Sequence, residues 1–425
     1  MKVLWVINTV LPKIGEDCGI KQGVGGGWLT GIAEELFFNE SIYLVVCFRN
    51  ESNIFEGSIG KNLKYYSFKT KGFYRYSKEV ENRFKEIILK EKPDIIHIFG
   101  TEFPHTLAAI NAVDFCSLQK RTLISIQGLV SVYAQHYFAN LPYYVVHKYT
   151  IRDLIKRDNI YLQSKKYAKR GEFEISALKK AYNVIGRTDW DEACVKTINP
   201  RVNYFFCNEI LRKEFYSSHW EFDCCEKHTI FLGSSAYPIK GCHCVFEIMP
   251  QILKKYPDAR VYVTGINPIK SKGFRGLIHK TFYQSYLKKL IKKNNLEDSV
   301  FFLGELSAQE MKARMLKSNV FILPSSIENS PNTLGEAMIL GVPCISADVG
   351  GVLNLAENKK DVLSYPFDEN YMLPYYVDKI FKDEKYARKL SKSAILHASR
   401  THNREINSNR LLEIYRTVLQ NELEK

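Results

Sequence analysis

The sequence contains no long hydrophobic run. No stretch is apolar enough, over enough residues, to form a membrane-spanning helix. Residues 1–12 are too short for a secretory signal peptide and lack its small-residue cleavage site, so we expect a first β-strand there. We expect a cytoplasmic protein.

The ten cysteines follow no disulfide framework. Their closest groupings are Cys224-Cys225 and Cys242-His243-Cys244, and no second pair of ligands stands at a spacing that suits zinc. We therefore expect reduced thiols and no metal site.

Acidic residues are outnumbered by basic ones. The chain has 46 Asp and Glu against 60 Lys and Arg, a formal net charge of +14. This balance favours an acidic partner, such as nucleic acid, an anionic membrane surface or a phosphorylated substrate. No nucleic-acid-binding signature accompanies the charge, so we expect no nucleic-acid partner.

A dinucleotide-binding fingerprint is also missing. The glycine-rich residues 23–27 precede a predicted helix at residues 29–38, but Trp28 stands where G-x-G-x-x-G needs its last glycine. Glycines at this place let backbone N–H groups approach a ligand closely, and a plain tight turn explains them equally well.

The sequence does contain a repeated alternation of short apolar strands with helical patterns, which predicts an α/β fold with mostly parallel sheets. The strands expected in the first half are residues 2–10, 42–48, 95–99, 122–126, 183–185 and 204–206. Those expected in the second half are residues 229–233, 260–264, 300–303, 320–323 and 344–349. The predicted domains are residues 1–208 and 228–402, with a polar linker at 209–227 and a last helix at 403–425.

Residues 320–352 carry the densest functional pattern. A buried strand ends at Pro324, and a polar loop follows it. A helix is then predicted over residues 332–340, with Ser330 as its N-cap and Gly341 at its end. Polar residues thus gather at the carboxyl edge of a parallel sheet, where open α/β sheets bind ligands.

Two carboxylates stand out in this stretch. Glu328 in the loop and Glu336 in the helix have seven residues between them. Because the helix N-terminus favours an anion, a diphosphate held there would leave one carboxylate on each side to bind hydroxyls. This arrangement suits a nucleotide-sugar, although an ordinary strand–helix–strand unit with two structural glutamates also fits the spacing.

The E-x7-E element, the run AMILGVPCISADVGG from residue 337 and the pair Lys240-Gly241 resemble the retaining glycosyltransferases of family 4, which have the GT-B fold. The resemblance is densest over residues 231–352. It implies two Rossmann-like domains that face each other across a cleft, with the donor in the second domain and the acceptor in the first. It also implies that the last helix packs back on the first domain, and that no cofactor or metal is required beyond the nucleotide diphosphate-sugar substrate.

The resemblance assigns roles to residues as well. Glu328 would orient the donor sugar and Lys240 would neutralise the departing diphosphate, so these are the expected catalytic residues. Glu336 would bind the ribose hydroxyls. The other expected donor contacts are Gly26, Gly27, Ser234, Gly265, Glu305, Leu306, Asn329, Ser330, Asn332, Thr333 and Leu334.

Two positions depart from the family pattern. Gln127 stands where many members have a histidine, and Ser234 where they have an arginine. Gln127 cannot titrate and Ser234 brings no charge, so Arg187 and Lys270 are alternative sources of the missing cation. His105, Gln127 and Arg187 are expected contacts of the acceptor or sugar. A surface position would explain His105 equally, and a structural ion pair would explain Arg187.

An Asp-x-Asp triplet, Asp189-Trp190-Asp191, is of a kind that holds a metal in a different glycosyltransferase fold. It follows a predicted strand and Thr188. We interpret it as the capped first turn of a helix, because acidic residues favour that end.

Residues 143–180 carry ten Lys and Arg with tyrosines between them. Such a composition fits a helix lying on an anionic membrane, and a solvated helical face is the alternative. We expect this region to dock a lipid-linked acceptor at the inner face of the cytoplasmic membrane.

The hypothesis from sequence is a metal-independent, retaining hexosyltransferase. It would move a sugar from a nucleotide diphosphate-sugar to a glycan or lipid-linked acceptor in the assembly of capsule, O-antigen or exopolysaccharide. The alternatives are a nucleotide-sugar epimerase or a phosphorylase of the same fold, and a catalytically degenerate binding protein.

Overall fold

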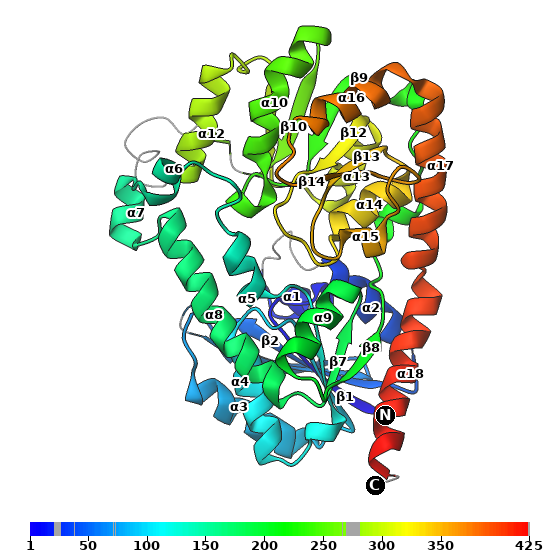
Figure 1. Cartoon of the computed structure of the whole chain (residues 1–425). Coiled ribbons are helices and arrows are strands. Elements are labelled where there is room, and N and C mark those ends of the chain that lie inside the picture. The colour runs from blue at the N-terminus through cyan, green and yellow to red at the C-terminus, as the bar shows by residue number, and fades with distance from the viewer. Residues whose placement is uncertain are drawn as a thin grey trace. The chain divides into compact units, whose positions relative to one another are not determined.

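The computed structural model describes residues 1–20, 27–37, 39–70, 72, 74–265, 267–268 and 281–423 (Figure 1). The chain divides into two compact α/β units, each built on one largely parallel sheet. Unit 1 comprises Met1–Val132, Tyr167–Arg212 and His402–Lys425, and unit 2 comprises Tyr133–Lys166 and Lys213–Thr401. The predicted fold class, with two Rossmann-like units, is confirmed.

Unit 1 contains an eight-stranded sheet in the order β3-β4-β2-β1-β5-β6-β7-β8, in which β3 and β4 pair antiparallel. The strands are β1 Lys2–Ile7, β2 Tyr43–Asn50, β3 Glu56–Ile59, β4 Leu63–Lys69, β5 Ile95–Phe99, β6 Thr122–Ser125, β7 Asn183–Gly186 and β8 Asn203–Phe206. The helices are α1 Pro12–Asp17, α2 Gly27–Phe37, α3 Lys78–Glu91, α4 Pro104–Phe115, α9 Asp189–Ile198 and α18 Arg404–Leu423. The boundary between the units falls within α5 Val130–Tyr133 and again within α8 Ile160–Lys180.

Alternation along β1 explains why helices cover both faces of this sheet. Leu4 and Val6 belong to a core that includes side chains of α3 and α4. Trp5 belongs to the opposite core, with side chains of α2 and α18. The last helix therefore packs on the first sheet, and Tyr415 Oη accepts a hydrogen bond from Trp5 Nε1 at 3.1 Å and lies 2.7 Å from His97 Nδ1.

Unit 2 contains a parallel six-stranded sheet in the order β11-β10-β9-β12-β13-β14. The strands are β9 Glu226–Leu232, β10 Arg260–Thr264, β11 Val300–Gly304, β12 Ser318–Leu323, β13 Cys344–Asp348 and β14 Leu363–Pro366. The helices are α6 Tyr143–His147, α7 Ile151–Lys156, α10 Cys242–Lys255, α12 Phe282–Lys293, α13 Ala308–Leu316, α14 Asn332–Leu340, α15 Val352–Leu355, α16 Met372–Lys382 and α17 Glu384–Thr401. No helix among the described residues has both the length and the apolar character to cross a membrane.

Each strand expected from the sequence is present, with ends that differ by up to three residues. The sequence analysis missed β3, β4 and β14. β3 and β14 are four residues long, which leaves little room for a period-two pattern, and β14 ends in proline.

The helix predicted over residues 332–340 coincides with α14, but its predicted N-cap is wrong. Pro331 is extended, with φ −72° and ψ 108°, and it takes the N-cap place instead of Ser330. Gly341 ends the helix in the left-handed region at φ 80°, which a glycine adopts without strain.

The division into units differs from the predicted boundary, which placed all of residues 1–208 together. The segment Tyr133–Lys166 packs within unit 2 because its polar groups are satisfied there. Ala139 O lies 2.9 Å from His243 Nε2, and Ser326 Oγ donates to His136 O at 3.0 Å. Two backbone carbonyls thus join the segment to α10 and to the loop after β12.

Candidate active site

The carboxyl edge of the unit 2 sheet brings together the loops that follow β9, β10 and β12. Ser235, after β9, donates its backbone N–H to Thr264 O at 3.1 Å. Gly265 has φ +104°, and a Cβ atom there would lie 2.9 Å from Ser235 Oγ. A Cβ atom on Gly233 would lie 3.7 Å from Thr333 Cγ2, at the start of α14. The segments that carry the predicted donor contacts Ser234, Gly265 and Thr333 thus meet at one sheet edge, the usual ligand position in such folds.

Lys240 is held at this edge by a close approach of two loops. Gly241 has φ +67°, and a Cβ atom on it would fall 1.6 Å from Pro324 O. The backbone N–H of Ser326 donates to Ile239 O at 2.8 Å. Only glycine fits at position 241, because any side chain would push the β9 loop away from the β12 loop.

Lys240 and Glu328 form an ion pair across these loops. Lys240 Nζ lies 2.6 Å from Glu328 Oε1, and Ser325 Oγ donates to the same oxygen at 2.7 Å. A third loop contributes from after β13, where Gly351 N–H donates to Glu328 O at 3.1 Å and a Cβ on Gly350 would lie 1.9 Å from that oxygen. The Glu328 side chain is 8% exposed and that of Lys240 is 34% exposed, so the cation keeps access to solvent.

Helix α14 begins directly after this pair. Glu336 lies on it and is buried, at 3% exposure. Leu334, one of the expected donor contacts, donates its backbone N–H to Pro331 O at 2.9 Å, so this N–H group is used within the helix. The predicted anion-binding role of Asn332 and Thr333, both half-buried, stays a prediction.

The remaining predicted donor contacts of unit 2 lie on the loops that follow β9, β11 and β12. Ser234 is half-buried, and its Oγ accepts the backbone N–H of Ala236 at 3.2 Å. Glu305 is exposed after β11, and Leu306 and Ser330 are half-buried. The Ser234 hydroxyl therefore accepts a hydrogen bond within its own loop, and the side chain brings no charge to the sheet edge.

Tyr133 is a neighbour of this edge that the sequence analysis missed. Its hydroxyl accepts the backbone N–H of Asn329 at 3.1 Å. Asn329 is itself buried, at 1% exposure. No local pattern marks a tyrosine at position 133 as a partner of residue 329, because the contact joins segments nearly 200 residues apart.

Three predicted positions remain to be considered. Gly26 and Lys270 lie outside the described residues. Gly27 begins α2 in unit 1, where a Cβ atom would lie 2.4 Å from Arg212 Cδ. At Gly27 the lack of a side chain makes room for an arginine of the same unit.

The carboxyl edge of the unit 1 sheet has a cavity of about 40 Å³. Its lining includes Gln127 and Arg187, two of the residues predicted to contact the acceptor or sugar. His97, Ser125 and Glu209 also line it. The sheet thus brings Gln127 and Arg187 together, from the ends of β6 and β7.

Arg187 is committed to the fold of unit 1. Its side chain is 4% exposed and forms an ion pair with Glu209 and a hydrogen bond to Ile126 O. Its backbone N–H donates to Asp191 Oδ2 at 3.0 Å. Of the two interpretations offered by the sequence, the structure shows the ion pair.

The surface interpretation of His105 is wrong. His105 follows Pro104 at the start of α4, is 5% exposed, and packs against Phe68 and Phe103 with ring centroids 5.1 and 5.5 Å away. Burial lowers the pKa of His105 to about 3, so the ring is neutral. The His105 side chain is therefore buried between Phe68 of β4 and Phe103 of the loop before α4.

Two glutamates at this edge were not singled out from sequence. Glu174 of α8 is fully buried and accepts hydrogen bonds from Thr101 Oγ1 at 2.6 Å and from the backbone N–H groups of Val130 and Ser131 at 3.0 and 2.9 Å. Glu102 has a buried Oε2 with no hydrogen-bond partner among the described residues. Burial, with the Glu174 carboxylate nearby, raises the pKa of Glu102 to about 7.

The Asp-x-Asp triplet forms a helix start, as the sequence analysis interpreted it. Thr188 is the N-cap of α9, and its Oγ1 accepts the backbone N–H of Asp191 at 3.0 Å. The Asp191 carboxylate binds Tyr204 Oη and the Arg187 backbone. Among the described residues no group of three or more His, Cys, Asp or Glu side chains is placed to hold a metal ion.

Comparison with known proteins adds to this geometry. The sequence model of the family described as glycosyl transferases group 1 matches residues 219–397, which lie in unit 2. The putative colanic acid biosynthesis glycosyltransferase WcaL of Escherichia coli is 30% identical over 127 residues, which cover 28% of this chain and 28% of WcaL. The matched stretches span less than half the length of the curated relatives.

Solved structures are similar over the whole chain. Sucrose-phosphate synthase from Thermosynechococcus elongatus has a TM-score of 0.69 at 17% identity, covering 99% of this chain and 100% of that one. Anabaena HepE in complex with UDP-glucose has a TM-score of 0.68 at 13% identity, covering 98% and 100%. The chain therefore has the fold of the GT-B glycosyltransferase superfamily, and its residues 219–397 match the glycosyl transferases group 1 family.

Proposed function

We propose that this protein is a retaining glycosyltransferase of family 4. It would move a hexose, without a metal, from a nucleotide diphosphate-sugar to a glycan or lipid-linked acceptor. The observation that carries the proposal is the ion pair of Lys240 with Glu328 in the loop that leads into α14. A cation, a carboxylate and a helix N-terminus at one sheet edge suit a substrate that combines a diphosphate with sugar hydroxyls.

In the proposed reaction, the bond between the anomeric carbon and the diphosphate oxygen breaks. A bond from the acceptor oxygen forms on the same face of that carbon, and the acceptor proton passes to the departing phosphate. Lys240 would turn from Glu328 to the diphosphate as its negative charge develops. Glu328, still held by Ser325, would then accept hydrogen bonds from the sugar hydroxyls.

The nucleoside would lie further along the same edge. Glu336 would bind the ribose hydroxyls, and the backbone of Gly265, Glu305 and Leu306 would contact the base. Asn332 and Thr333 would present the first turn of α14 to the phosphates. Gln127, beside the unit 1 cavity, is the residue that we retain as a contact of the acceptor or sugar.

A UDP-sugar donor and a surface-polysaccharide acceptor are the specific forms of this proposal. HepE, which shares the fold, has been solved with UDP-glucose, and WcaL is named for colanic acid biosynthesis. All ten cysteines are free thiols, which suits a reducing compartment, and we place the protein in the cytoplasm at the inner membrane face.

A thermal-shift panel of UDP, GDP, ADP and their sugar conjugates tests the donor site. A ligand that binds only the folded state raises the melting temperature. We expect one nucleotide series to raise the melting temperature, and Glu336→Ala to abolish this shift. The isosteric variant Glu336→Gln checks that the substituted protein still folds. A panel without any shift would favour a degenerate binding protein.

Product analysis tests the reaction itself. The proposal requires sugar transfer that depends on an added acceptor and keeps the anomeric configuration of the donor. Conversion of the donor without an acceptor would indicate an epimerase, and a requirement for free phosphate would indicate a phosphorylase.

A further inference from the structure

Helix α7, Ile151–Lys156, exposes its apolar side chains and buries an acidic one, the reverse of the usual arrangement on a protein surface. Ile151, Leu154 and Ile155 share one helical face, and their side chains are 54, 63 and 72% exposed. Asp153, on the same helix, is fully buried. A surface helix normally turns its apolar side inward, but none of the residues that the structure describes covers this face of α7.

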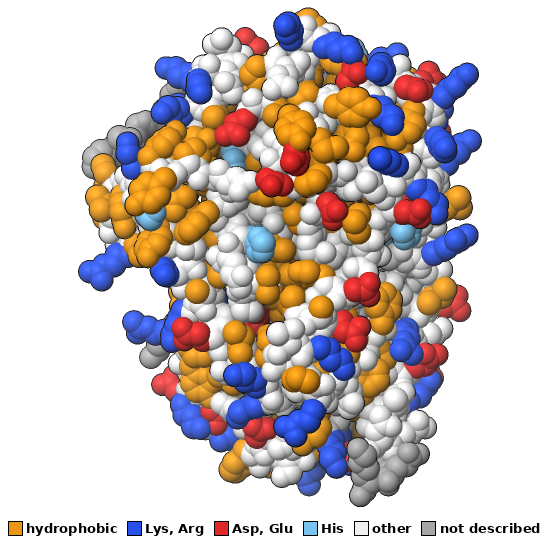
Figure 2. All heavy atoms as spheres, viewed as in Figure 1, with side chains coloured by type: hydrophobic (Ala, Val, Ile, Leu, Met, Phe, Trp, Pro, Cys, Tyr) orange, Lys and Arg blue, Asp and Glu red, His pale blue; other side chains and the backbone are white. Residues whose placement is uncertain are grey.

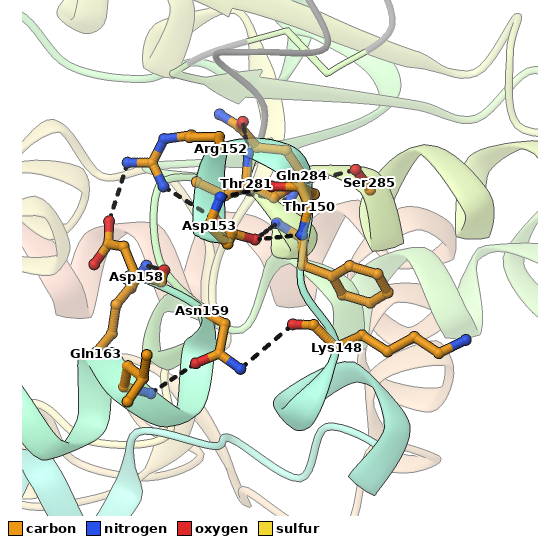
Figure 3. Close-up of polar contacts among 12 residues, drawn as sticks. Lys148, Thr150, Arg152, Asp153, Asp158, Asn159, Gln163, Thr281, Gln284 and Ser285 are labelled. Carbon is orange, nitrogen blue, oxygen red and sulfur yellow. Dashed lines mark hydrogen bonds and ion pairs between the residues drawn. The ribbon is translucent and has the colours of Figure 1, made fainter. Parts of the chain in front are cut away.

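The buried side of α7 is fixed by a polar network (Figure 3). Asp153 Oδ2 accepts the backbone N–H of Thr150 at 3.1 Å and that of Phe282, the first residue of α12, at 3.0 Å. Arg152 Nη1 and Nη2 lie 3.1 Å from Asp153 Oδ1 and from Asp158 Oδ2. Since one carboxylate serves the N-termini of two helices, α7 cannot roll to bury its aliphatic face without breaking these bonds.

Tyrosines extend the apolar face beyond α7. Tyr143 and Tyr144 of α6 are 78 and 42% exposed, and Tyr149 is 43% exposed. Lys289 Nζ of α12 lies 5.4 Å from the centre of the Tyr144 ring, so α12 adjoins the patch. Figure 2 shows orange side chains gathered where Figure 1 places α6 and α7, with Lys and Arg around them. We call these six residues, Tyr143, Tyr144, Tyr149, Ile151, Leu154 and Ile155, the α6–α7 patch.

Within the two stretches of chain that form and adjoin the patch, residues 143–166 and 281–293, the exposed charge is of one sign. Residues 143–166 and 281–293 contain two carboxylates in all. Asp153 is buried, and Asp158 is bound by Arg152 and by Lys166, whose Nζ lies 2.9 Å away. The exposed cations of the two stretches are Lys148, Lys156, Arg157, Lys165, Lys288, Lys289, Lys292 and Lys293.

We propose that the α6–α7 patch docks on an anionic lipid bilayer, with the aliphatic face of α7 entering the boundary between headgroups and acyl chains. Exposed aliphatic side chains ringed by Lys, with tyrosines at the rim, are the combination that an anionic interface binds. A second copy of this chain would set the same cations against one another. Nucleic-acid bases could stack on the tyrosines, but they would leave Ile151, Leu154 and Ile155 uncovered, because these side chains offer neither a hydrogen bond nor a planar face.

This assignment is narrower than the sequence hypothesis, which gave the membrane role to all of residues 143–180. Arg170 of α8 is 8% exposed and donates to Glu102 O at 2.6 Å, and Lys166 is bound to Asp158. Arg170 and Lys166 therefore bind other groups of the protein and are not part of the proposed membrane surface. The inference deepens the membrane part of the proposed function and does not depend on glycosyl transfer.

The experiment is co-sedimentation of the full chain with vesicles of phosphatidylcholine containing 0–40% phosphatidylglycerol, at low and high salt. We expect binding that rises with the anionic fraction and falls at least tenfold in high salt. Leu154→Ser/Ile155→Ser and Lys156→Glu/Arg157→Glu should each weaken binding at least tenfold. Leu89→Ser/Leu396→Ser and Lys254→Glu/Lys385→Glu are the controls, because these side chains are as exposed but lie outside the patch.

Equal binding to uncharged vesicles, or wild-type binding by the patch variants, would overturn the proposal. So would a change of oligomeric state in Leu154→Ser/Ile155→Ser, which would assign the patch to a second copy. Displacement from vesicles by an oligonucleotide that needs Leu154 and Ile155 would assign it to nucleic acid. The nucleotide thermal shift, measured on the same variants, separates this test from that of the donor site.

Discussion

The carboxyl edges of the two sheets carry similar residues and use them differently. In unit 2, Lys240 reaches Glu328 across two loops and remains 34% exposed. In unit 1, Arg187 follows a strand end in the same way, yet it is 4% exposed and bound by Glu209 and Ile126 O. Lys240 therefore remains accessible to a ligand, whereas Arg187 is enclosed by the fold of unit 1.

Removing the buried cation should break unit 1. Arg187→Ala removes the ion pair with Glu209, whose side chain is only 11% exposed, and we expect the free energy of unfolding to fall by about 3–5 kcal/mol. Chemical denaturation measures this, with the exposed Arg201→Ala as control. Unchanged stability together with lost activity would show that Arg187 binds a ligand and does not stabilise the fold.

Removing the half-exposed cation should instead break catalysis. We expect Lys240→Ala to lower kcat by about 10²–10³-fold, because the departing diphosphate loses its cation. Glu328 keeps the hydrogen bond from Ser325, so we expect a smaller loss of stability than in Arg187→Ala. Lys254→Ala on α10 is the control, and Lys240→Arg should restore part of the rate. Wild-type transfer by Lys240→Ala would refute the site assignment.

The packing of α18 on unit 1 gives a smaller effect. Tyr415→Phe removes the hydroxyl that contacts Trp5 Nε1 and His97 Nδ1 and leaves both buried nitrogens without that partner. We expect a loss of about 1–3 kcal/mol in the free energy of unfolding. Tyr375→Phe, at an exposed position, should cost nothing measurable, and equal effects of the two would contradict this account.

Acid should weaken unit 1 through His97. Burial lowers the pKa of His97 to about 3, against an ordinary value near 6.5. The unfolded chain binds the proton first, so the stabilisation is present above pH 6.5 and is lost as the pH falls toward 3. Denaturation of His97→Gln between pH 7 and 4 should show a shallower dependence than the wild type, and equal slopes would exclude this origin.

Glu102 should make the stability of unit 1 depend on pH in the opposite direction, with stability falling as the pH rises. Its pKa is raised to about 7, mainly by burial, so the folded state holds its proton more tightly than the unfolded chain does. Its contribution is fully present below about pH 4.5 and is lost as the pH rises through 7. Glu102→Gln should flatten that part of the stability profile; a steeper profile in the variant would contradict the raised pKa.

The sequence predicted more of the unit 2 edge than of the unit 1 edge. Gly241, Gly265 and Gly350 adopt positive φ values, and two of them lie so close to a carbonyl oxygen that no Cβ fits. Such glycines mark where loops must meet, and Lys240 stands beside one of them. In unit 1, His105 and Glu174 are placed by long-range packing, for which no local pattern exists.

The sequence by itself determined the alternation of strands and helices, the helix α14 and the polar character of the loop before it, because these depend on local periodicity and turn chemistry. Only the tertiary structure decided that Arg187 is buried in an ion pair, that Tyr133 meets Asn329, and that α7 turns its aliphatic face outward. Each of these depends on which side chains remain in water once distant segments have packed, and the order of residues along the chain does not contain that information.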